Sequence, residues 1–186
     1  MSPATPPGAR RRRRTAEEGT LEVFVADEQA DHPVELARWE ALARDVLGHE
    51  GLDGEAELSL LFVDEAAIAQ LNASFMGQEG PTDVLAFPID AEDEIGVGRS
   101  PDGGTTGPDR DPGQEVPLLL GDVVICPAVA ARNAPSHAGT YDDELALLIV
   151  HGILHVLGHD HATPEETEVM QARERELLDR FHRSHR

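Results

Sequence analysis

Residues 151–161 carry the strongest structural signal in the chain, His151-Gly152-Ile153-Leu154-His155-Val156-Leu157-Gly158-His159-Asp160-His161. His151 and His155 are four residues apart, so on a helix their side chains share one face. Gly158 follows one turn later and can take the positive φ that ends a helix and turns the chain back. That reversal can bring His161 to the other two imidazoles. The pattern predicts a helix that ends in a three-histidine metal site.

Three neutral imidazoles suit zinc and leave one position of a tetrahedral ion open for water, as in catalytic sites. Zinc lowers the pKa of that water towards about 7, which supplies a nucleophile at neutral pH. The spacing is that of the zinc proteases with the pattern His-Glu-x-x-His-x-x-Gly-x-x-His. Here Gly152 occupies the glutamate position. Because such proteases need that carboxylate as general base, the sequence disfavours a protease.

Other ionisable residues near the histidines are weaker candidates. Asp160 is a candidate catalytic residue, which can orient a ligand imidazole or cap the turn. The backbone of Glu144 precedes that of His151 by about 10.5 Å along the helix axis, so we do not expect it to bind the metal. His182 and His185 fall in a charged tail, where we expect both to be solvated.

Outward from the histidines, the chain alternates between strand and helix patterns. Thr140 can cap the histidine helix, and Thr163, Pro164 and Glu166 form the start signal of the last helix. Such alternation on a short chain implies an α+β or α/β single domain with helices packed on a sheet. We predict strands over 21–25, 58–63, 84–87 and 118–126, and helices over 33–47, 64–75, 128–134, 141–157 and 164–181.

Two segments do not fit a packed domain. Residues 1–19 include the run Arg10 to Arg14 and are expected to form a disordered, arginine-rich arm. Residues 91–117 hold six glycines, four prolines and seven acids, which predicts a disordered acidic insertion. The remaining residues of 20–186 are expected to form the single domain.

Composition excludes several function classes. All fifteen basic residues are arginine, so there is no lysine for a pyridoxal Schiff base or a nucleotide-binding phosphate loop, and we expect no nucleotide cofactor. One cysteine, Cys126, excludes an internal disulfide and cysteine-based zinc fingers, and a reducing cytoplasm fits best. No apolar run approaches the roughly 18–20 residues that would span a bilayer, so we expect no membrane partner. The net charge of −21 opposes tight nonspecific binding of nucleic acid.

Four ordered motifs give the chain a resemblance to a known family. Residues 151–161 resemble the His-Gly-x-Leu-His-Leu-x-Gly-[aromatic or His]-Asp-His signature of the YbeY family, the bacterial rRNA-maturation endoribonucleases. Leu71-Asn72 with residues 80–88 resembles the family's Leu-Asn and Pro-Thr-Asp-Val-Leu-Ser-Phe block. Residues 120–125 resemble its Leu-Gly-Asp-Ile strand, and Glu144-Leu145 matches an acidic-Leu pair. The resemblance covers about residues 20–180.

The resemblance implies an α+β fold with a four-stranded mixed sheet and about five helices. It also implies cleavage of single-stranded RNA, in maturation of the 16S rRNA 3′ end and in ribosome quality control. The expected partners are the 16S rRNA precursor and the small ribosomal subunit with its proteins. One zinc ion per chain is expected on His151, His155 and His161.

Two residues depart from the family pattern. Many members carry an arginine shortly after the Leu-Asn pair, where this chain has Phe75-Met76. A guanidinium there would hold a phosphate through two hydrogen bonds, which methionine cannot do. Arg132 is the candidate substitute for binding the substrate. Ala86 replaces a serine, so one hydroxyl is absent.

Two other functions compete with the endoribonuclease. A noncatalytic ribosome-assembly factor with a structural or vestigial zinc site is favoured by the absent arginine. It is disfavoured by the open zinc position, because structural sites usually have four protein ligands. A metalloprotease is the weakest alternative, given Gly152.

Overall fold

The computed structural model describes residues 21–52, 56–89 and 118–185, and these form an α+β fold built on one mixed sheet. The strands are β1 (Leu21–Asp27), β2 (Ala56–Phe62), β3 (Val84–Pro88) and β4 (Leu118–Ile125). Their order in the sheet is β1-β2-β4-β3. The first three in this order are parallel, and β3 pairs antiparallel with β4 at one edge. The predicted four-stranded mixed sheet is therefore confirmed.

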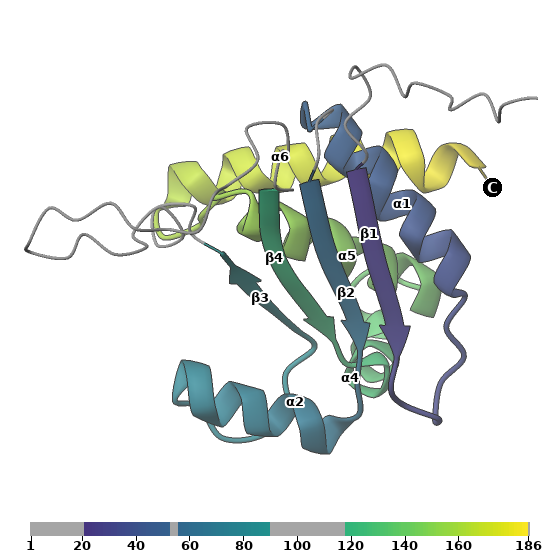
Figure 1. Ribbon diagram of the computed structural model, residues 1–186, viewed down its shortest axis with the longest axis vertical. Coiled ribbons are helices and arrows are strands. Elements are labelled where there is room, and N and C mark those ends of the chain that lie inside the picture. The colour runs from purple at the N-terminus through teal and green to yellow at the C-terminus, as the bar shows by residue number, and fades with distance from the viewer. Residues whose placement is uncertain (1–20, 53–55, 90–117, 186) are drawn as a thin grey trace, which may run out of the picture.

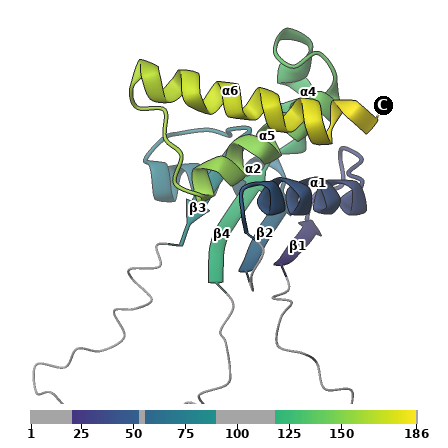
Figure 2. The ribbon, with the colours of Figure 1, turned by 90° about the horizontal axis from the view of Figure 1, so that it is seen from above.

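Helices α1 (Leu36–His49), α5 (Tyr141–Val156) and α6 (Pro164–Phe181) are stacked in layers on one side of this sheet (Figures 1 and 2). Helices α1 and α5 lie against the strands, and α6 lies outside them as a further layer. Helix α2 (Glu65–Leu71) and helix α4 (Pro127–Asn133) lie at the end of the sheet where β2 and β4 finish. The five predicted helices are all found.

Capping residues start the helices where the sequence indicated. Thr163 Oγ1 accepts from the Glu166 backbone N–H while the Glu166 carboxylate accepts from the Thr163 N–H, which completes the capping box of α6. Thr140 caps α5 by accepting from the Asp143 N–H, and Asp64 caps α2. Each bond satisfies a backbone donor that the first helical turn leaves unpaired.

Two predicted helices differ from the observed ones by more than one residue at their limits. The first begins at Leu36 and not at residue 33, because the backbone before it is not helical, with φ of −86° and ψ of 84° at Glu35. The helix expected over 64–75 ends as an α-helix at Leu71 and continues as a π-helical turn, η1 (Asn72–Met76). Gly77, with φ of 65°, ends that turn in the left-handed conformation. Short 3-10 turns, η2 (Ala134–Ser136) and η3 (Arg183–His185), complete the described elements.

The main core lies between the sheet and α1, α5 and α6. In β2, alternate residues Ala56, Leu58, Leu60 and Phe62 are buried on this face. Helix α5 is apolar around most of its surface because the sheet covers one side and α6 the other. Helix α5, which carries the histidines, is therefore packed on two sides.

A glycine in β4 lets β3 approach. Leu120 is an extra residue in β4 opposite β2, and Gly121 follows it with φ of 142°. A Cβ on Gly121 would lie 2.2 Å from the backbone oxygen of Phe87 in β3. Only glycine fits this contact, which positions the edge strand beside the histidines.

One expectation about the C-terminal tail was wrong. His182 is buried, with its Nε2 2.8 Å from Asp143 Oδ1 and its ring tilted by 31° to that of Trp39. The end of α6 packs on α1 and so covers a residue that its charged neighbours suggested was solvated. The predictions for the arm at 1–19 and the insertion at 91–117 lie outside the described residues, as does the side chain of His185.

Among the described helices, none has both the length and the apolar character needed to cross a lipid bilayer. Cys126, which directly follows β4, is buried.

Candidate metal centre

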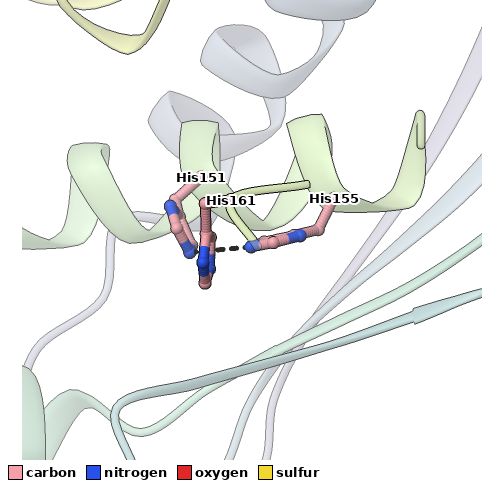
Figure 3. A group of neighbouring side chains, drawn as sticks. All are labelled: His151, His155 and His161. Carbon is pink, nitrogen blue, oxygen red and sulfur yellow. Dashed lines mark hydrogen bonds between the residues drawn. The ribbon is translucent and has the colours of Figure 1, made fainter. Parts of the chain in front are cut away.

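The three histidines of the sequence pattern converge at one point (Figure 3). His151 and His155 project from the last two turns of α5, and His161 reaches back from the segment that follows it. One ring nitrogen from each lies within 4.8 Å of the others. Gly158, with φ of 91°, makes the turn between them, and the N–H of His159 closes it on the Leu154 carbonyl. The predicted geometry of helix, turn and third histidine is confirmed.

The donor set and its spacing fit a metal ion such as zinc. The Nε2 atoms of His151 and His155 are 3.1 Å apart. Two nitrogens bound to one tetrahedral zinc at about 2.0–2.1 Å would be about 3.3–3.4 Å apart. Burial and the two neighbouring histidines lower the pKa of His155, which favours the neutral imidazole that binds a metal. No fourth ligand joins the three imidazoles among the residues that the structure describes, which leaves room for water or substrate.

A buried carboxylate on α6 orients one of the three histidines. The Nδ1–H of His151 donates to Glu174 Oε1 at 2.6 Å, which leaves the Nε2 lone pair of His151 directed at the metal position. Glu174 was not singled out from the sequence. It lies on the buried face of α6 with Met170, Leu177 and Leu178, and a carboxylate at such a position is the signal that could have identified it.

Gly152 has a packing role between the two helical ligands. A Cβ at this position would lie 2.5 Å from Val123 Cγ1 and 3.2 Å from its Cγ2, both on β4. The glycine therefore lets α5 lie close to the sheet. A glutamate side chain, as zinc proteases have here, would be directed into the core and could not reach a substrate.

The histidines open onto two cavities. The first, of about 270 Å³, is bounded by β3 residues and by Met76, which is 47% exposed. Met76, where the resemblance led us to expect an arginine, thus lines the cavity of the three histidines. The second, of about 360 Å³, is shared by His151 and His161 with residues of α6, with Asp83 and with His137.

The other candidate residues lie further from this centre. The Asp160 side chain is exposed and its Oδ1 accepts from the His161 N–H at 2.7 Å, so it fixes the turn that carries this ligand. Arg132 is exposed and paired with Glu65, and it does not line either cavity. Glu144 is fully buried and bonded to His137, and it is not part of the three-histidine group found among the described residues.

Comparisons with known proteins agree on one family. The family model described as Endoribonuclease YbeY matches residues 24–182. Proteins named Endoribonuclease YbeY from Salinispora tropica and Thermobifida fusca are 49% and 42% identical to the chain. The first alignment covers 74% of this chain and 82% of the relative, and the second covers 88% and 96%.

The relative from Frankia casuarinae bears the same name and is 42% identical over 85% of this chain and 73% of its own length. Among solved structures, the solution structure of TM1509 from Thermotoga maritima is similar, with a TM-score of 0.52 and 23% identity. That likeness covers 88% of this chain and 93% of the other, and it supports the fold.

Proposed function

Because this chain belongs to the YbeY family of endoribonucleases, we propose that it is a metal-dependent endoribonuclease that hydrolyses phosphodiester bonds in RNA. The observation that carries the proposal is the convergence of His151, His155 and His161, with one nitrogen from each within 4.8 Å of the others. We propose zinc as the metal, one ion per chain, because the ligands are all imidazoles in a set of three.

Some residues at this centre would hold the metal, and others position these ligands. A bound divalent ion would supply positive charge beside the phosphodiester and a polarised water. Helix α5 holds His151 and His155 on one face, and Glu174 fixes the ring of His151 through a 2.6 Å hydrogen bond. Gly152 allows this helix to pack closely against the sheet, which places the histidines at the edge of the cavity where RNA would enter.

We propose that the substrate is single-stranded RNA at the 3′ end of the 16S rRNA precursor, with a further role in ribosome quality control. The small ribosomal subunit and its proteins would be the partners and the cytoplasm the location. The net charge of −21 opposes direct binding of RNA, so basic ribosomal proteins would have to bring this acidic chain to its substrate. Cleavage of naked RNA should then be weak and sensitive to salt.

Asp160 as a catalytic residue and Arg132 as a substrate-binding residue stay predictions. The Asp160 carboxylate adjoins the His161 backbone, from which it can influence the metal ligands. Arg132 would have to leave Glu65 to bind a phosphate. Arg132→Ala should weaken RNA binding if it makes that exchange, and an unchanged affinity would remove it from the site.

The direct test combines metal analysis with RNA cleavage. Purified wild-type protein and His155→Ala are assayed on a short 16S rRNA 3′-end precursor with small ribosomal subunits present. We expect one zinc per wild-type chain, and loss of both zinc and cleavage in the variant. One zinc with no cleavage by the wild type would contradict the proposal.

A noncatalytic assembly factor is the second candidate, and one observation favours it. Met76 stands at the cavity of the three histidines, where a family arginine would hold a phosphate. On this reading His155→Ala would stay folded and still support rRNA processing in cells. A protease has no such support, since Gly152 packs against Val123.

A further inference from the structure

His137 stands at the cavity beside the metal centre with one ring nitrogen tied to a buried carboxylate. Its Nδ1 lies 2.9 Å and 3.0 Å from the two carboxylate oxygens of Glu144. The Glu144 side chain is 0% exposed, whereas the His137 side chain is 60% exposed. A buried acceptor of this kind holds the Nδ1–H towards itself and leaves Nε2 at the open side of the ring.

The backbone around this pair is also fixed. The N–H of His137 and the N–H of Gly139 both donate to the Ala134 carbonyl, at 3.2 Å and 2.7 Å. The N–H of Ala138 donates to Glu144 Oε2 at 3.1 Å, which satisfies the carboxylate a second time. The imidazole is therefore held in place by α5 on one side and by its own turn on the other.

The cavity connects His137 to the metal centre. His137 lines the same cavity of about 360 Å³ as His151 and His161. Its carboxylate partner, Glu144, lies on α5 two turns before His151, so one helix positions both the metal ligands and this imidazole. Gly152 stands where zinc proteases have their general base, so the histidine helix supplies no carboxylate at that position.

We propose that His137 is the general acid of this centre and that Glu144 is its positioning residue. The inference rests on the proposed endoribonuclease function. The attacking oxygen forms a bond to phosphorus, and the bond from phosphorus to the leaving ribose oxygen breaks with its electron pair. Protonated His137 donates the proton on Nε2 to that oxygen. The proton of the attacking group passes to solvent, and His137 takes one back from solvent.

The test compares two substitutions of His137 in the full chain loaded with zinc. His137→Ala removes the imidazole, while His137→Gln keeps an amide that can still donate to Glu144 but cannot transfer a proton. We expect both to lower the rate of RNA cleavage by about 10²–10⁴-fold, the usual contribution of general acid catalysis. Melting temperature and zinc content should match those of the wild type. His49→Ala, which removes another histidine–glutamate pair whose residues line neither cavity, should cleave normally.

A substrate with sulfur in place of the leaving oxygen tests whether His137 acts by protonating the leaving group. Because a thiolate leaves without a proton, the His137 variants should cleave this RNA at nearly the wild-type rate. Two oligonucleotides are used, with sulfur at either bridging position, and one should show the recovery. Full activity of His137→Gln on ordinary RNA, or no recovery with either sulfur substrate, would overturn the role of His137. The endoribonuclease proposal would not be affected by either result. Absence of cleavage by the wild type would refute the endoribonuclease proposal as well.

Discussion

Gly152→Ala probes the contact that brings α5 onto the sheet. The added Cβ would lie 2.5 Å from Val123 Cγ1. That is at least about 1 Å inside the usual carbon–carbon separation of about 3.5–4.0 Å. Overpacking of this kind costs about 1–3 kcal/mol. Replacing glycine by alanine inside a helix offsets about 1 kcal/mol of that cost. We therefore expect the free energy of unfolding to fall by about 0–2 kcal/mol.

Val123→Ala separates the two effects because it removes both Cγ atoms. In that background Gly152→Ala should raise the free energy of unfolding by about 1 kcal/mol, since only the helix-propensity gain remains. The coupling free energy between the two changes should be about 1–3 kcal/mol. Urea denaturation of the four metal-free proteins measures it. A coupling below about 0.5 kcal/mol, which independent sites show, would refute the contact.

The same four proteins test whether the contact serves the metal centre. Gly152 lies between His151 and His155, so a helix pushed from the sheet moves both ligands relative to His161 and the cavity. Zinc affinity, measured by competition with a chromophoric chelator, should fall in Gly152→Ala and recover in the double variant. Equal affinities in all four would show that the packing has no effect on the site.

Three further predictions follow from single contacts. Glu174→Gln should weaken zinc binding by about 10–100-fold with the fold retained, because the charged partner of His151 is lost; unchanged affinity by chelator competition would contradict this. Burial raises the pKa of Tyr141 to about 12, so the folded chain keeps the phenol proton where the unfolded chain, with a pKa near 10, loses it. The free energy of unfolding should therefore decrease as pH rises from about 10 towards 12, and this decrease should be less steep in Tyr141→Phe. The chain has a single tyrosine, so absorbance titration follows Tyr141 directly, and a midpoint near 10 in the folded protein would contradict the reasoning. Met76→Arg should increase RNA cleavage by about 10-fold or more, because a guanidinium at the cavity can pair with a phosphate; an unchanged rate would argue that the position does not meet the substrate.

Local patterns predicted most of the fold because they depend on neighbours in the chain. The capping box of Thr163 and Glu166 arises within a few residues, and α6 lies where expected. The apolar run of β2 is also local, and this strand begins two residues before its predicted limit and ends one residue before it. Predictions of helix ends and of burial were less accurate where tertiary packing or turn geometry decides them. The π-helical turn after Leu71 is one such case, and the buried His182 at the end of α6 is another.

The amino-acid sequence by itself determined the three metal-ligand candidates, because His151, His155 and His161 are separated by one helical turn and one glycine turn. Their partners were decided by the tertiary structure alone. Glu174 reaches His151 only because α6 packs across α5, and Gly152 is needed only because Val123 of β4 faces it. His137 meets the cavity only because a 3-10 turn folds back onto the buried Glu144. Spacing along one helix is a local property, whereas these contacts join elements whose approach depends on the packing of the whole core.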